Sequence, residues 1–188
     1  MENKDQKTKK KFYKRWWFWL IVVIILFIAI ASSGNKPQKV GNTNNSGSQN
    51  TAAKQDEVFK VGDQVKMGSS IVTINKVEYS QGGQYSKPTA GNEWLNLNIT
   101  IENTGSTGQG VSTLGQMFIR DGDKNSYQVA VTNKAMENPG FGLDGQILAN
   151  SKRTGWVGFE VPKTATGLQF QYNGSMFGGG NILINLDR

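Results

Sequence analysis

Few residues in this chain can carry chemistry, because the two most versatile types are missing. The 188 residues include no Cys and no His. Disulfides, thiol nucleophiles, the usual catalytic triad and ordinary zinc sites are therefore excluded. The carboxylates that remain show no paired spacing for acid–base catalysis and no partner motif. We therefore expect a protein that is not an enzyme and that holds no cofactor.

One acidic run has the alternating oxygen ligands with which a calcium-binding loop begins. It reads Asp121-Gly122-Asp123-Lys124-Asn125. Such a loop needs Gly at its sixth position and a bidentate Glu at its twelfth, where this chain has Ser126 and Thr132. The run is therefore predicted to be a hairpin turn, and no metal site is expected. A weak surface site completed by a carboxylate from another loop stays open as an alternative.

Two glycine-rich stretches, 140–145 and 174–180, have the composition of phosphate-binding loops. Neither joins a strand to a recognisable helix, so the helix N-terminus that supplies most of the electric field is missing from both. Both are predicted to be irregular loops. Their large apolar side chains are candidates for a contact patch that binds a protein or a glycan, namely Phe141, Met176 and Phe177. The alternative is that these side chains plug the ends of the folded domain.

Two tryptophans form a second candidate binding surface. Trp94 and Trp156 each lie next to the apolar face of a predicted strand, in the polar phase of the alternation. On neighbouring strands they would make an outward platform for sugar rings or for the edge of another protein. The alternative is a structural role, in which they cover a sheet edge or reach under a loop.

The elements that must position these residues are strands. From Leu95 to Ile101, Leu and Ile alternate with polar residues, which places one face of a strand in a core and the other in water. Similar patterns predict strands at Ile71–Tyr79, Met117–Arg120, Tyr127–Val129, Val157–Val161, Leu168–Tyr172 and Ile182–Leu186. Turn clusters separate these strands, and no long helical periodicity appears after residue 34. The pattern predicts an all-β fold, an immunoglobulin-like antiparallel β-sandwich, with an up-and-down barrel as the alternative.

The N-terminal part of the chain has a different composition. Residues 1–15 form a basic tail, and residues 16–31 carry no polar side chain. A helix over residues 16–34 would be about 28 Å long, close to the roughly 30 Å hydrocarbon core of a bilayer. Aromatic residues at its basic end suit the headgroup layer, and the preceding cations predict a cytoplasmic tail. We therefore expect residues 16–34 to be a transmembrane helix that binds the lipid bilayer.

Cleavage of this segment is the alternative. Ala29 and Ala31 imitate a signal-peptidase site, and cleavage after Ala31 would release a secreted protein. The apolar run reaches that site without the usual polar stretch, and it is long enough to span, which favours an uncleaved anchor. Both interpretations place the rest of the chain outside the cell.

The remainder divides into a linker and a domain. Residues 35–56 are polar, with Val40 as the only branched aliphatic residue. They cannot bury enough apolar surface to offset the entropy of ordering, so they are predicted to be a disordered linker. Residues 57–188 are long enough for one domain with its own core. They hold 11 of the 21 basic and 11 of the 14 acidic side chains. This formally neutral part is not expected to bind nucleic acid.

Several short motifs follow one another along the predicted domain. They are Val61-Gly62-Asp63, Lys87-Pro88-Thr89-Ala90-Gly91-Asn92, Asn103-Thr104-Gly105 and Phe159-Glu160-Val161-Pro162. Together they resemble the bacterial family of extracellular telokin-like domains of unknown function, related in fold to a secreted mycobacterial immunogenic antigen. The resemblance implies an immunoglobulin-like sandwich displayed outside a bacterial cell, and it brings no catalytic residues. Many relatives place a lipid-modified Cys at the end of the apolar run, where this chain has Ala31-Ser32-Ser33.

These observations predict a single-pass membrane protein whose residues 57–188 lie outside the cell as a non-catalytic binding module. The expected partners are the lipid bilayer, through residues 16–34, and a cell-envelope protein or glycan. A secreted antigen-like protein and a glycan-acting envelope enzyme are the alternatives.

Overall fold

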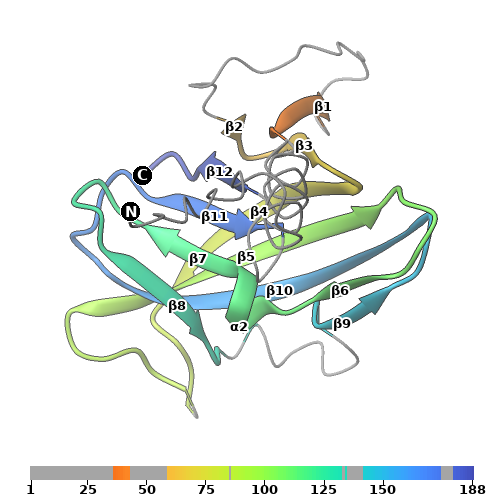
Figure 1. The fold of residues 1–188 in the computed structure, drawn as a ribbon. Helices are drawn as coiled ribbons and strands as arrows, with labels where there is room; N and C mark the ends of the chain where they lie inside the picture. The colour runs from red at the N-terminus through yellow and green to blue at the C-terminus, as the bar shows by residue number, and fades with distance from the viewer. Residues whose placement is uncertain (1–35, 43–58, 85, 133, 135–141, 175–179) are drawn as a thin grey trace, which may run out of the picture. The chain divides into compact units, whose positions relative to one another are not determined.

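The computed structural model of the protein describes residues 36–42, 59–84, 86–132, 134, 142–174 and 180–188. The chain divides between Gly34 and Asn35, and every described residue belongs to the second part. These residues form an all-β sandwich (Figure 1). Its elements are β1 (Gln38–Asn42), β2 (Phe59–Lys60), β3 (Asp63–Met67), β4 (Ser70–Ser80), β5 (Asn92–Asn103), β6 (Gln109–Val111), α2 (Thr113–Gln116), β7 (Met117–Arg120), β8 (Ser126–Ala130), β9 (Gly145–Ile147), β10 (Ser151–Pro162), β11 (Gln169–Asn173) and β12 (Asn181–Asn185).

The two layers of the sandwich belong to one continuous sheet. The strand order is β1-β3-β4-β5-β10-β8-β7-β11-β12-β2, and β6 and β9 form a separate ribbon. β8 pairs with both β10 and β7, so it carries the sheet from the first layer into the second (Figure 1). β12 and β2 pair in parallel, whereas the other pairs in the sheet are antiparallel. Among the described strands the sheet ends at β1 and β2, so it does not close into the alternative barrel.

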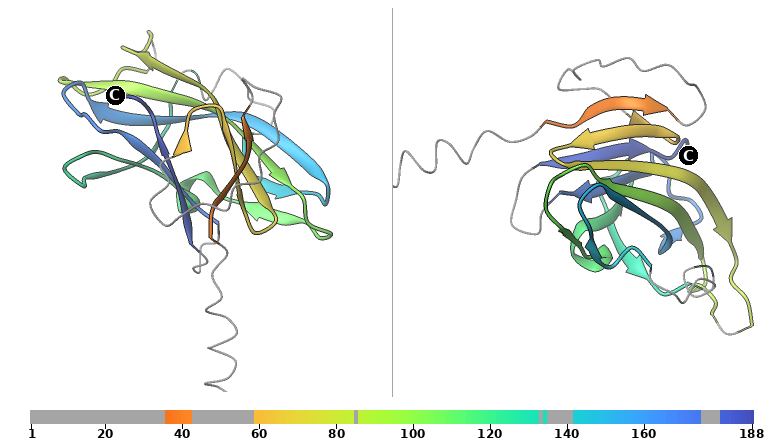
Figure 2. Two further views of the ribbon diagram at one scale, coloured as in Figure 1. Left: turned by 90° about the horizontal axis from the view of Figure 1, so that it is seen from above. Right: turned by 90° about the vertical axis from the view of Figure 1, so that its right-hand side faces the viewer.

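Apolar side chains from both layers meet between them and form the core. Phe159 of β10 lies opposite Leu95 of β5 in the first layer. In the second layer Ile119, Phe170 and Ile184 lie side by side on β7, β11 and β12. All five side chains are fully buried. Burying one such side chain contributes about 1.5–3 kcal/mol relative to exposure, so this core is the main source of stability. Figure 2 shows the two layers from two further sides.

The alternating patterns predicted the longer strands well. The seven predicted strands correspond to β4, β5, β7, β8, β10, β11 and β12. The short strands β2, β6 and β9 have only two or three residues each, too few to show an alternation. β3 was not among the predicted strands, and it follows directly on a turn. The turn ends at Gly62, whose φ is 88°, and Asp63 is already the first residue of the strand.

β1 corrects the prediction of a disordered linker over residues 35–56. It forms an edge strand that pairs antiparallel with β3. The Lys39 Nζ lies 2.8 Å from Asp63 Oδ1, and Asn42 Nδ2 donates a hydrogen bond to the same oxygen at 2.7 Å. Backbone pairing and two polar contacts need little apolar surface, which is why the low hydrophobicity of the segment was misleading. The folded domain therefore begins before residue 57.

The predicted basic tail (1–15) and transmembrane helix (16–34) lie outside the described residues. Within the described ranges, no helix has the length and apolar character needed to cross a membrane. Helix α2, which lies between β6 and β7, has four residues.

Candidate binding face

The side of the first layer that points away from the core carries the polar residues of adjacent strands. β5 contributes five alternate residues to it: Trp94, Asn96, Asn98, Thr100 and Glu102. β10 pairs in register with β5, so Trp156 lies opposite Asn98 and Thr154 lies opposite Thr100. β4 pairs with the other side of β5. We call this surface of β3, β4, β5 and β10 the outer face.

Both tryptophans of the predicted platform lie on the outer face, but the platform does not form. Trp94 is only 6% exposed, and its Nε1 donates a hydrogen bond to the carbonyl of Ser86 at 3.4 Å. It therefore reaches under the β4–β5 loop, which is the structural alternative considered above. Trp156 is half-buried, and the Lys134 Nζ lies 5.1 Å from the centre of its ring.

The segment that follows β8 crosses the outer face between the two tryptophans. Thr132 is completely buried there, and its Oγ1 donates a hydrogen bond to Asn96 Oδ1 at 2.5 Å. On the neighbouring strand, a Cβ atom at Gly158 would lie 2.2 Å from Thr132 Cγ2. The absence of a side chain at Gly158 therefore admits this segment, which closes one half of the outer face.

Charged side chains at the covered half are paired. The Lys76 Nζ lies 2.6 Å from Glu78 Oε1, and the Lys134 Nζ lies 3.7 Å from Glu78 Oε2. The hydrogen bond from Lys76 is the main reason why the pKa of Glu78 falls below its usual value, and the charge of Lys134 adds to the effect.

The other half of the outer face is open and contains a shallow hollow of about 140 Å³. Pockets that enclose small molecules are larger, about 300–1,000 Å³. The hollow therefore suits contact with one side of a larger ligand. It is lined by Gln64, Ile71, Thr73, Asn75, Thr100, Glu102 and Lys152.

A β-bulge places Asn75 in the hollow. β4 has one extra residue relative to β5 at this position, and such bulges redirect a side chain. The Asn75 Nδ2 donates hydrogen bonds to Asn98 Oδ1 and Thr100 Oγ1, both at 2.9 Å. The Thr100 Oγ1 in turn lies 2.7 Å from Thr154 Oγ1. Four polar side chains from three strands are thus held in one network, which preorganises the surface.

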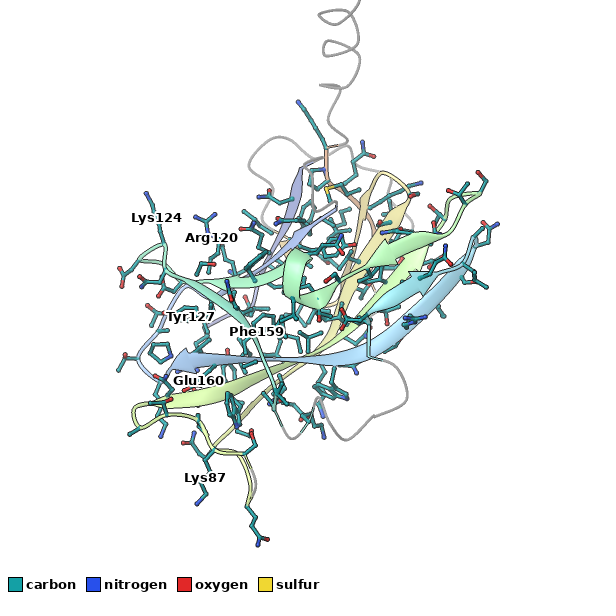
Figure 3. The ribbon with its side chains drawn as sticks, turned by 60° about the horizontal axis from the view of Figure 1, so that its bottom comes forward. Lys87, Arg120, Lys124, Tyr127, Phe159 and Glu160 are labelled. Atoms are coloured by element: carbon teal, nitrogen blue, oxygen red, sulfur yellow. The ribbon has the colours of Figure 1, made fainter. Side chains whose placement is uncertain are left out.

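The Lys-Pro-x-x-Gly-Asn motif forms part of the β4–β5 loop, and Glu160 holds it in place. The Glu160 Oε1 accepts hydrogen bonds from the Asn92 Nδ2 at 2.9 Å and from the Thr89 backbone N–H at 2.7 Å. Both bonds lower the pKa of Glu160, and the bond from Asn92 has the larger effect. Figure 3 shows Glu160 at the base of this loop and Lys87 pointing away from the domain. The motif is therefore structural.

The acidic run that was tested as a calcium loop forms the predicted turn between β7 and β8. The Asp121 carboxylate accepts hydrogen bonds from the backbone N–H and the Nδ2 of Asn125, both at 2.8 Å, and from the Tyr127 hydroxyl at 2.7 Å. The bonds from Asn125 and Tyr127 lower the pKa of Asp121. The pKa of Tyr127 is raised, mainly by burial of its hydroxyl and secondly by its hydrogen bond to Asp121. Across the described part of the chain, no three acidic, His or Cys side chains gather as metal ligands.

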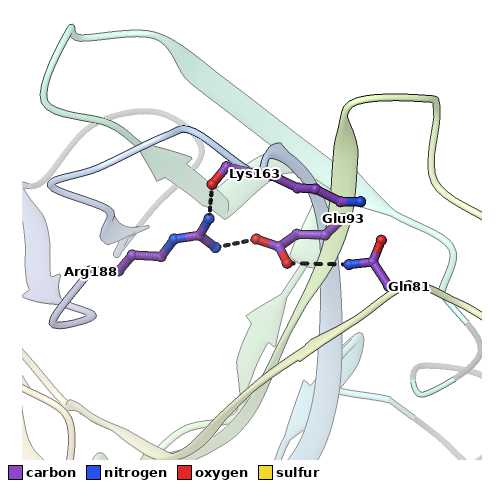
Figure 4. Close-up of polar contacts among 4 residues, drawn as sticks. All are labelled: Gln81, Glu93, Lys163 and Arg188. Atoms are coloured by element: carbon purple, nitrogen blue, oxygen red, sulfur yellow. Dashed lines mark hydrogen bonds and ion pairs between the residues drawn. The ribbon is translucent and has the colours of Figure 1, made fainter.

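Arg188 closes one end of the sandwich. Its guanidinium contacts Glu93 Oε1 and the carbonyl of Lys163, and Gln81 donates to the other Glu93 oxygen at 3.5 Å (Figure 4). The same guanidinium lies 4.7 Å from the ring centre of Tyr79. Glu93 is only 9% exposed, so the cation neutralises a nearly buried carboxylate. This cluster joins the C-terminal segment to β4 and β5 and serves the fold.

Three of the five predicted binding residues, Phe141, Met176 and Phe177, lie outside the described residues. Sequence reasoning also missed the hollow. Part of its signal was present in the polar phase of β5, at Thr100 and Glu102, but these residues were interpreted only as a solvated strand face, and Lys152 lies before the strand predicted at Val157–Val161. The bulge at Asn75 shifts the apolar phase of β4 from Val72 and Ile74 to Val77, but a phase shift by itself does not identify a binding site.

Comparison with known proteins agrees with the predicted resemblance. The model of the family described as "Domain of unknown function (DUF4352)" matches residues 59–182. The uncharacterized lipoprotein YjhA of Bacillus subtilis is 26% identical over 121 residues, which cover 58% of this chain and 55% of that protein. The chain therefore spans about half the length of this curated relative.

Solved structures show the same fold. The crystal structure of the Bacillus subtilis yjhA protein matches with a TM-score of 0.55 at 23% identity, over 69% of this chain and 100% of that one. The secreted protein MPT63 of Mycobacterium tuberculosis matches with a TM-score of 0.50 at 15% identity, over 72% of this chain and 100% of that one. At these identities the likeness concerns the fold alone.

Proposed function

Since the chain belongs to the DUF4352 family, whose function is unknown, we propose a role from its own surface: a non-catalytic module that binds cell-envelope material outside the cell. The observation that carries this proposal is the open, preorganised half of the outer face. The other half is covered by the β4–β5 loop and by the segment after β8. A polar hollow on a rigid sheet suits recognition of an extended partner.

An extracellular position is supported by two similar proteins. One is named a lipoprotein and the other a secreted protein. This chain has no Cys to carry a lipid, so in our proposal the apolar residues 16–34 hold it in the membrane instead, with residues 1–15 in the cytoplasm.

Binding is favoured over catalysis by the lining of the hollow. Glycoside hydrolysis normally uses a pair of carboxylates on either side of the scissile bond. Glu102 is the one carboxylate that lines the hollow. A surface with a single acid can hold a glycan but lacks the second group for that reaction.

Anchoring is tested by protease treatment of intact cells, followed by fractionation and mass spectrometry. We expect a membrane-retained fragment that contains residues 16–34 and release of the outer domain. A soluble mature protein that begins at Ser32 would instead establish the secreted alternative.

Binding is tested by co-sedimentation of the full-length protein, in a detergent without a sugar headgroup, with washed cell-wall fragments. We expect saturable binding and no release of soluble sugar. Release of reducing sugar during incubation would indicate an enzyme. If wild-type protein does not sediment with the wall at any concentration, the proposed function is wrong.

A further inference from the structure

The chemistry of the hollow indicates the class of ligand that it takes. We infer that the hollow, together with Trp156 at its end, binds a neutral sugar chain. The inference rests on the proposed function and specifies the part of the envelope that the module recognises.

The lining matches the hydrogen-bonding character of sugar hydroxyls. A hydroxyl both donates and accepts, and so do the amide of Gln64 and the hydroxyl of Thr100. Asn75, whose Nδ2 already donates to Asn98 and Thr100, offers its Oδ1 as an acceptor. These groups come from β3, β4 and β5, so they are spread across the sheet and not along one strand. Sugar rings present such hydroxyls along their edges, so a chain lying across the strands meets one partner after another.

The charges in the hollow balance. Glu102 and Lys152 lie opposite each other on β5 and β10, and they are the acid and the base among the lining residues. A site for a phosphate-rich polymer would present an excess of Lys and Arg. The balanced pair favours a ligand without net charge, whose hydroxyls can donate to Glu102 and accept from Lys152.

Trp156 extends the hollow with an apolar surface. It lies opposite Asn98, whose Oδ1 accepts the hydrogen bond from Asn75. The ring is half-buried, with the Lys134 ammonium above it. The exposed part of the ring offers an apolar surface to the C–H groups of a sugar ring while the amides hold the hydroxyls.

A peptide partner would use a different part of the sheet. Extended peptides add to a sheet edge through backbone hydrogen bonds. In the described sheet these edges lie at β1 and β2. The hollow lies on the face of the sheet, where the contacts available are made by side chains.

The test measures how soluble competitors displace the full-length protein from cell-wall fragments. The competitors are chitotetraose as a neutral sugar chain, a peptide released from the same wall, and polyphosphate. We expect displacement by chitotetraose and binding that persists in 0.5 M NaCl, because the ligand carries no net charge. If chitotetraose does not compete, or if only the peptide or polyphosphate does, the inference is wrong.

Variants locate the site. Asn75→Ala and Trp156→Ala should each weaken binding to wall fragments and to chitotetraose by about five- to tenfold. Trp156→Phe should recover most of the affinity, and Asn181→Ala, an exposed amide on β12, should change nothing. Circular dichroism melting confirms that each variant is folded. If the two site variants bind the wall as well as the wild type does, the inference is overturned and the proposed function stands. If the wild-type protein does not bind the wall, the proposed function itself is contradicted.

Discussion

Glu160 fastens the loop before β5 through two hydrogen bonds to one oxygen atom. Replacing it by Gln removes the charge and keeps the shape. We expect Glu160→Gln to lower the free energy of unfolding at pH 7 by about 0.5–1 kcal/mol, a small loss because the carboxylate is partly solvated. Chemical denaturation measures it, and Glu102→Gln, a carboxylate on the same face, serves as the control.

The pH dependence of this loss follows from the lowered pKa of Glu160. The stabilisation is fully present above the ordinary pKa of 4.5 and disappears as the pH falls through the lower pKa of the folded state. The difference between wild type and Glu160→Gln should therefore shrink below about pH 4.5. A difference that stays constant down to pH 2 would show that the charge of Glu160 does not contribute.

Asn103 supplies the side-chain amide of the Asn-Thr-Gly motif, and this amide is buried. It is 1% exposed, and its Nδ2 donates to the carbonyls of Thr107, Ile147 and Leu148 at 2.7, 3.1 and 3.2 Å. Asn103→Ala leaves these carbonyls without that donor and should lower the unfolding free energy by about 2–3 kcal/mol. Asn181→Ala is the matched surface control. Equal melting temperatures for the two variants would refute this role.

The sequence predicted the side of the strand on which a residue lies better than it predicted how exposed that residue is. The alternation around Trp94 and Trp156 correctly placed both on the side away from the core. Whether such a residue is open depends on what covers it. Trp94 is covered by the carbonyl of Ser86, and a pattern along one strand carries no information about a loop that folds back over it.

At the scale of elements, the segment after β8 packs on β10 because Gly158 leaves room for Thr132. Gly158→Ala should lower the unfolding free energy by about 1–3 kcal/mol, as overpacking does. The double variant Gly158→Ala/Thr132→Gly should lose less unfolding free energy than the two single variants together, since Thr132→Gly removes the atoms that clash with the new Cβ. Strict additivity in denaturant titrations would argue against this contact.

β1 depends on the buried carboxylate of Asp63, which accepts from Lys39, Asn42 and the backbone N–H of Lys60. Asp63→Ala should detach β1 while the rest of the sandwich stays folded. Hydrogen exchange is the measurement: amides of residues 38–42 should exchange at least about tenfold faster, with those of β5 unchanged. Asp123→Ala, in an exposed turn, is the control, and uniform acceleration in Asp63→Ala would indicate global destabilisation instead.

Strand prediction succeeded where a strand has one buried and one solvated face over several residues, as in β5 and β10. It failed at β1, where backbone pairing and the contacts of Lys39 with Asp63 replace apolar burial. The hollow was equally hidden, because it requires the register that sets Lys152 beside Glu102 and the bulge that turns Asn75 outward. The register joins two strands that are distant in the sequence, and the effect of the bulge depends on how β4 pairs with β5.

For the molecule as a whole, the motifs that identify the family serve to build the sandwich. Asp63, Asn103 and Glu160 each fix a strand or a loop. The family match begins at residue 59, after β1. The matched residues 59–182 include these motifs and also every residue that lines the hollow.

β1 also determines how the protein would respond to mechanical load. With the membrane anchor that we propose, force applied to the outer domain by a bound wall polymer enters the sheet at Gln38, the first residue of β1. An edge strand held by backbone pairing with β3 is the first element to yield. Its release frees residues 38–58, which are 21 residues before β2 begins at Phe59 and have an extended length of roughly 70 Å. Optical-tweezer pulling should show this step before the sandwich unfolds, and Asp63→Ala should abolish it. Release of β1 would then lengthen the connection between the membrane and the wall while the rest of the domain stays folded.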